Sequence, residues 1–419
     1  MRSIKYHFSI LKYINSIFVN NHKILNGFFL RILSVWGIKE PLRLLMTFIL
    51  QHIIGTEYQC HYQEQYQNIK QEFSEIGSIY GIDITKSFLK SVTNSMITWK
   101  LQLFQAKILK DKIKEKVLDV DWTTLVSFSS KREGAEIGRN TKYKGKPCYK
   151  LFASKIGKYF IDIKLFSGNV NSKFFFQKAI KRAKSLGYKF EIVRADSAFA
   201  TIKNLFFLEK LSLLYAIGIS SSFKVVKKGI AKFKKLARNK NKSIIHIRKG
   251  IAGYDLGKVF LANGLETRVV VIRRISRRKN KKTGKWKIRI YYYSITTNLL
   301  YSVEKLYKFY HKRQTIESGF RELKNHYFLE RLPVKNLKGN EFYIFTKILA
   351  MNLFKLFLEE MLPKSFHNMQ RKTFLRKVLL RTITFDILGK VNIIAKAKYS
   401  WHLRRLFAKI EKIKTNQIA

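Results

Sequence analysis

The fold class follows first from residues 117–128, VLDVDWTTLVSF. Apolar and β-branched residues nearly alternate with polar ones here, which predicts a β-strand. Asp119 and Asp121 are two residues apart, so they lie on the same face of that strand. An isolated aspartate is usually solvated at a strand end, but one at the centre of an apolar strand is costly to bury without a cation. Either aspartate is therefore a candidate metal ligand.

The next hundred residues predict an alternation of strands and helices. Strands are expected over CYKLFASKI (148–156), YFIDIKLF (159–166), FEIVRADSAF (190–199) and LLYAIGIS (213–220), and helices from Asn171 or Ser172 to about Leu186 and over 201–212. Three strands, a helix, a strand, a helix and a strand is the element order of the ribonuclease-H-like fold. The first and fourth strands are neighbours in that fold, which would bring Asp196 beside the aspartates of the first strand.

Residues 221–297 interrupt this alternation and are strongly basic, with a dense run of lysines and arginines from Lys224 to Lys249. Further along, RVVVIRRI (268–275) and WKIRIYYYSI (286–295) flank KKTGK, which predicts two strands joined by a hairpin turn. We therefore expect an inserted β-rich domain with a basic surface.

The stretch YHKRQTIESGFRELK (310–324) carries Tyr310, Arg313, Glu317 and Lys324. Asn298 or Ser302 is expected to start the helix that carries them. On one continuous α-helix these four positions fall within roughly 60° of one another, so a carboxylate would be flanked by two cations and a phenol. The alternative is an ordinary solvated helix face held by ion pairs between neighbouring turns.

Composition points to an intracellular protein with a polyanionic partner. The chain has 419 residues, and its 83 Lys and Arg against 27 Asp and Glu give a net charge of +56, which favours nucleic acid. The 2 cysteines, Cys60 and Cys148, predict neither a disulfide framework nor a zinc site. We expect no membrane span and no cleaved signal peptide, although the basic amphipathic N-terminus leaves a membrane-surface helix as an alternative.

Five segments are expected in all. They are a helical N-terminal region (1–112) that is either a DNA-end recognition module or a plain bundle, a first part of the ribonuclease-H-like core (113–220), the inserted domain (221–297), a second part of the core with the motif helix (298–365) and a basic helical C-terminal region (366–419).

The spacing Y-x2-R-x3-E-x6-K resembles that of insertion-sequence DDE transposases. LDVDWTT (118–124), REGAEIGRNTKYKGKPCY (132–149), GNVNS (168–172) and VRADSAF (193–199) also resemble blocks of one branch, the thirteen-eighty group of the insertion-sequence-four class. Trp122 departs from that pattern, which more often has a small residue there, and the N-terminal region matches only loosely.

The resemblance implies roles for particular residues. It selects Asp121 over Asp119 and implies that Asp121, Asp196 and Glu317 are catalytic and hold two Mg²⁺ or Mn²⁺ ions. It implies that Arg313 and Lys324 contact DNA phosphates, and that Tyr310 contacts a phosphate or orders the helix. For Trp286, either a core position or stacking on a displaced base during hairpin formation is expected.

The function implied is a DDE transposase, which cleaves DNA at element ends and joins them to target DNA. Its partners would be double-stranded DNA and a second copy in a synaptic homodimer, in a bacterial-type cytosol with the nucleoid. The alternatives are a catalytically silent, transposase-derived DNA-binding protein and a stand-alone ribonuclease-H-like nuclease.

Overall fold

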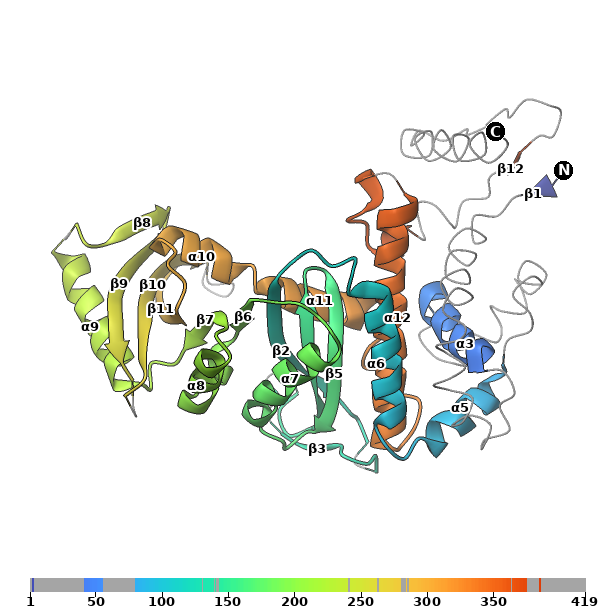
Figure 1. Ribbon diagram of the computed structural model, residues 1–419. Helices are drawn as coiled ribbons and strands as arrows, with labels where there is room; N and C mark the ends of the chain where they lie inside the picture. The colour runs from blue at the N-terminus through green and yellow to red at the C-terminus, as the bar shows by residue number, and fades with distance from the viewer. Residues whose placement is uncertain are drawn as a thin grey trace. The chain divides into compact units, whose positions relative to one another are not determined.

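The computed structural model describes residues 2–3, 41–55, 80–129, 131–138, 140, 143–239, 242–261, 264–279, 284, 286–362, 364–374 and 384–385. The chain forms two compact units, and Figure 1 draws its helices and strands. One unit comprises Met1–Phe104, Lys131–Glu133 and Arg321–Ala419, and the other comprises Gln105–Ser130 and Gly134–Phe320. We call them the helical unit and the sheet unit.

The sheet unit is built on one large mixed sheet. Its core strands are β2 (Val117–Val126), β3 (Glu136–Ile137), β4 (Pro147–Ile156), β5 (Tyr159–Ser167), β6 (Ile192–Ala195) and β7 (Leu214–Ile219). β4 lies antiparallel between β2 and β5, whereas β6 is parallel to both β2 and β7. The predicted strands are therefore present, and their pairing confirms a mixed α/β class consistent with a ribonuclease-H-like core.

Two short helical pairs follow the strands of this core. They are η3 (Ser172–Phe175) with α7 (Phe176–Ser185), and η4 (Ser197–Phe199) with α8 (Ile202–Lys210). The predicted strand 190–199 ends early, because the Asp196 side chain accepts a hydrogen bond from the Ser197 backbone N–H and caps η4. Phe176 and Phe199 stack at 5.4 Å, so aromatic packing joins the two pairs.

The described residues of 221–297 form a helix and several strands. These are α9 (Lys224–Arg238), β8 (Ile245–Arg248), β9 (Ile251–Phe260), β10 (Glu266–Lys279) and β11 (Trp286–Thr297). The lysine-rich start forms a helix beside the expected β structure, because Val226, Gly229 and Phe233 recur at helical spacing and are buried. The predicted hairpin is confirmed by the antiparallel pairing of β10 with β11. β11 also pairs with β7, so these strands continue the core sheet (Figure 1).

The predicted single helix through residues 310–324 is wrong. The chain forms α10 (Val303–His311) and α11 (Gln314–His326), with a turn at Lys312 and Arg313. The Arg313 N–H donates to the Tyr310 carbonyl, one residue short of α-helical spacing, and this tightening breaks the helix. Ser302 caps α10 as expected, accepting from the Lys305 N–H.

The helical unit is centred on α12 (Leu337–Met361), which is buried along most of its length. The other described elements of this unit are α3 (Pro41–Ile54), α5 (Ile82–Ser91), the start of α6 (Met96–Leu109), the end of α11, η6 (Lys364–Phe366), α13 (Arg371–Phe374) and the short pair β1 (Arg2–Ser3) and β12 (Thr384–Phe385). Phe48 and Phe88 pack on Phe342, at ring distances of 5.9 and 5.3 Å. Much of the expected 1–112 and 366–419 regions lies outside the described residues. Within the described residues, none of the helices has the length and hydropathy needed to cross a bilayer.

Candidate active site

Asp121 and Asp196 come from neighbouring parallel strands. The register pairs Asp119 with Arg194 and Val120 with Ala195, so Asp121 and Asp196 occupy the next step, where β6 ends. Asp121 is only 7% exposed, whereas Asp196 is half-buried. The predicted adjacency of these two aspartates therefore has a direct cause in the strand register.

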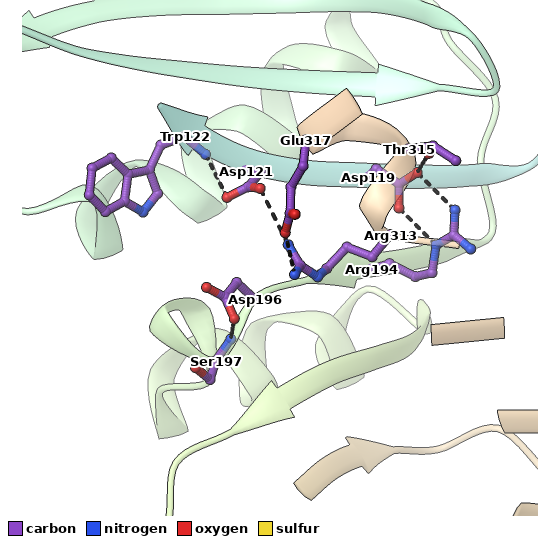
Figure 2. Close-up of polar contacts among 9 residues, drawn as sticks. All are labelled: Asp119, Asp121, Trp122, Arg194, Asp196, Ser197, Arg313, Thr315 and Glu317. Carbon is purple, nitrogen blue, oxygen red and sulfur yellow. Dashed lines mark hydrogen bonds and ion pairs between the residues drawn. The ribbon is translucent and has the colours of Figure 1, made fainter. Parts of the chain in front are cut away.

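Glu317 reaches the same place from the first turn of α11. The Arg313 guanidinium links it to β2: Nη1 donates to Asp121 Oδ2 at 3.3 Å, and Nη2 donates to Glu317 Oε1 at 2.6 Å. Figure 2 shows this guanidinium between the two carboxylates, with Asp196 beneath them. Three carboxylates from distant parts of the chain thus surround one cation.

Burial dominates the electrostatics of Asp121. It raises the pKa of that carboxyl to about 7, against the opposing effects of Arg313 and of the Trp122 N–H, which donates to Oδ1 at 2.8 Å. The charges of Asp196 and Glu317 act in the same direction as burial. Burial lowers the pKa of Arg313, but the Tyr310 phenol and the carboxylates raise it above its ordinary value. Burial is therefore the main cause of the raised pKa of Asp121, and Arg313 only partly offsets it.

Asp119 is held differently. It is 1% exposed and forms a two-point ion pair with Arg194, in which Nε donates to Oδ1 at 2.7 Å and Nη2 to Oδ2 at 2.8 Å (Figure 2). Burial raises the pKa of Asp119, and Arg194 opposes this. Thr315 approaches the same carboxylate, with Oγ1 at 3.5 Å from Oδ2. Both oxygens of Asp119 are therefore engaged within the protein.

Tyr310 packs into the sheet beside Asp196. A Cβ added to Gly218 of β7 would lie 2.6 Å from the Tyr310 hydroxyl and 2.9 Å from the Ser197 nitrogen, so glycine is needed for this approach. Burial raises the pKa of Tyr310 to about 12, which keeps the phenol protonated at neutral pH.

The two remaining predicted residues are Lys324 and Trp286. Lys324 is on α11 within the helical unit, where its ammonium is 3.2 Å from Glu330 Oε1. Trp286 is the first residue of β11, pairs with Lys279 and is 68% exposed. The alternative of a core tryptophan is therefore wrong.

The donor set is made only of carboxylate oxygens, which suits Mg²⁺ or Mn²⁺. Among the described residues, however, no three His, Cys, Asp or Glu side chains are arranged to hold a metal ion. The Arg313 guanidinium is itself paired with both Asp121 and Glu317, as a cation shared by the two carboxylates would be. The carboxylates are therefore suitable ligands for divalent cations, provided that the Arg313 guanidinium moves away from Asp121 and Glu317.

The sequence interpretation overlooked Arg194. A signal was present, because Asp119-x-Asp121 on one strand and Arg194-x-Asp196 on the next share the same spacing. In a parallel pair that puts Asp121 beside Asp196, this spacing also puts Asp119 beside Arg194.

Residues 112–353, more than half of the chain, match the model of the transposase DDE domain family, and the chain belongs to this family. No curated protein matches it. The solved structures that are similar at low scores include two transposase complexes. A piggyBac transposase synaptic complex with hairpin DNA has 14% identity and a TM-score of 0.35, covering 63% of this chain and 51% of that one. A Mos1 transposase paired-end complex with left transposon end has 14% identity and a TM-score of 0.18, covering 38% and 53%. The chain thus spans about half the length of each.

Proposed function

We propose that the protein is an insertion-sequence transposase of the thirteen-eighty type, which cleaves DNA at element ends and joins the ends to target DNA. The observation that carries this proposal is the gathering of Asp121, Asp196 and Glu317 around Arg313. In a family of DNA-recombining enzymes, such an oxygen-only site suits phosphoryl transfer.

Asp121, Asp196 and Glu317 would hold two divalent cations, which when bound activate the attacking oxygen and stabilise the leaving oxygen. Asp121 is the ligand from β2, because both oxygens of Asp119 are engaged by Arg194. The nucleophile is water in the cutting step and the freed 3′-hydroxyl in the joining step.

The cations of the site position DNA. Once Arg313 releases its carboxylates, its fork of N–H donors can bind a phosphate next to the scissile bond. Lys324 on the same helix binds a further phosphate. Tyr310, held against Gly218, fixes the end of α10 and orients Arg313.

The inserted segment adds a second DNA contact. α9 carries exposed lysines along its outer face, and between Glu266 and Glu304 the sequence has no acidic residue. Such a surface neutralises phosphates without reading sequence. Exposed Trp286 is free to stack on a displaced base. The whole assembly would be a homodimer on two DNA ends in a bacterial-type cytosol.

The test uses plasmid DNA that carries the inverted repeats flanking the coding sequence. We expect nicking at the repeat ends with Mg²⁺ and none with EDTA, followed by joining of the 3′ ends to a second plasmid. Cleavage without joining would contradict the proposal and indicate a stand-alone nuclease. Tight DNA binding without cleavage in Mg²⁺ or Mn²⁺ would contradict it and indicate a catalytically silent DNA-binding protein.

A further inference from the structure

Arg194 connects three elements that meet behind the carboxylates. Its Nε and Nη2 atoms donate to Asp119 of β2, and its Nη1 donates to the Phe309 carbonyl of α10 at 2.8 Å. The guanidinium carbon also lies 4.8 Å from the centre of the Phe309 ring. Arg194 is 6% exposed, so water does not compete for these bonds.

The Phe309 carbonyl belongs to the last turn of α10, where carbonyls lack partners within the helix. The partial negative charge at a helix C-terminus favours a nearby cation. Here that cation is the buried Arg194 guanidinium, whose orientation is fixed. Arg194 therefore fixes the point at which α10 stops. The Lys312 N–H donates to the same carbonyl at 3.2 Å and starts the turn toward α11.

The chain beyond this point carries the site. The Arg313 N–H donates to the Tyr310 carbonyl, and the Arg313 side chain reaches Asp121 and Glu317. A shift in the end of α10 would be transmitted to Tyr310, Arg313 and Glu317 together, because they follow within eight residues.

We propose that Arg194, oriented by Asp119, is a positioning residue that fixes the α10–α11 junction and thereby holds Glu317 and Arg313 against Asp121. The effect on catalysis rests on the proposed function, whereas the effect on the junction does not. Stability alone is a weak reason for such a pair, since replacing both members of a buried ion pair by apolar residues is often neutral or stabilising.

The experiment compares two double variants of the full chain. Asp119→Leu/Arg194→Met removes both buried charges and leaves the Phe309 carbonyl with the Lys312 N–H but without its side-chain donor. The matched control is Asp162→Leu/Arg182→Met, which removes another two-point ion pair of the sheet unit, with bonds of 2.7 and 2.9 Å. Each protein is examined by thermal melting, amide hydrogen exchange over residues 309–318, and DNA cleavage kinetics.

The proposal predicts faster exchange confined to residues 309–318 in the first variant only. It also predicts a fall in kcat of at least about tenfold with an unchanged KM, since positioning acts on the transition state. Unchanged exchange would overturn the proposal, and so would faster exchange with normal cleavage. An equal fall in kcat in the Asp162→Leu/Arg182→Met control would also overturn the proposal.

Arg194→Lys provides a second variant if the double variant does not fold. Its single ammonium keeps the charge beside Asp119 but cannot form the fork and also reach Phe309. We expect a near-normal melting temperature with the same local exchange and loss of kcat; normal values of both would overturn the proposal. If wild-type protein does not cleave at all, the proposed function fails, while the exchange measurement still decides whether Arg194 fixes the junction.

Discussion

The Arg313 guanidinium lies 3.3 Å from the Asp121 carboxylate, although 192 residues separate the two in sequence. The same guanidinium is 2.6 Å from Glu317. An internal cation therefore stands between two of the three proposed ligands. Metal binding would release Arg313 at the moment when a DNA phosphate needs a partner.

Arg313→Gln tests this relation. Because divalent cations no longer displace a paired guanidinium, they should bind the variant more tightly and stabilise it more. Ligand at 100 times its Kd stabilises a protein by about 2.7 kcal/mol, so a change in affinity is measurable as a shift in Tm. We expect a larger Mn²⁺-induced shift than in wild type, with Arg182→Gln as the control. An equal shift would show that Arg313 does not compete with metal.

The exposed position of Trp286 predicts a separation of functions. Trp286→Ala should slow second-strand processing but leave first-strand nicking and Tm unchanged, since loss of one stacked base costs about 1–3 kcal/mol. Gel analysis of both strands would measure the two steps. Phe260→Ala, at a residue that is 70% exposed in the same segment, is the control and should affect neither step. Equal slowing of both strands by Trp286→Ala would exclude base stacking.

Neutralising lysines of α9 should change the salt dependence of DNA binding. Lys224, Lys227, Lys228 and Lys235 are exposed, and the slope of log K against log salt should fall by about 0.9 for each DNA phosphate that the variant no longer neutralises. Replacing all four by Gln should leave the preference for repeat ends unchanged. Replacing Lys184, Lys189, Lys203 and Lys210 by Gln provides a charge-matched comparison. If the α9 variant keeps the wild-type slope, α9 does not contact DNA.

His52 predicts how stability changes with pH. Burial, with help from Lys347 and Arg371, lowers its pKa well below 6.5, and its Nε2 is 3.0 Å from the Thr346 hydroxyl. Since the unfolded chain protonates first, stability is fully present above about pH 6.5 and is lost as pH falls below it. His52→Gln should flatten urea unfolding free energies between pH 7 and pH 5. An equal decline in the variant would assign the loss to other groups.

The sequence predicted the strands of the core well, because alternation and β-branched residues are local signals. The adjacency of Asp121 and Asp196 was predicted from those strands, because the order of strands and helices along the chain indicated which strands are neighbours in the sheet. The prediction failed at the 310–324 stretch, where periodicity continues across the break at Arg313. The residues before that break contact Arg194 and Gly218, which are distant in sequence, so local periodicity carries no sign of these contacts. The helix at Lys224–Arg238 was missed although its apolar residues recur at helical spacing, because its lysines were interpreted only as a basic surface.

The most direct measurement is the Mg²⁺-dependent nicking rate of Asp121→Asn beside that of Asp119→Asn, on the same repeat-end DNA. Both changes keep the shape of the side chain and remove one negative charge. The account predicts no detectable nicking by Asp121→Asn with DNA affinity unchanged, and likewise for Asp196→Asn and Glu317→Gln. Asp119→Asn should nick measurably, at a reduced rate, because it only orients Arg194. An active Asp121→Asn beside an inactive Asp119→Asn would contradict the assignment of the catalytic carboxylates.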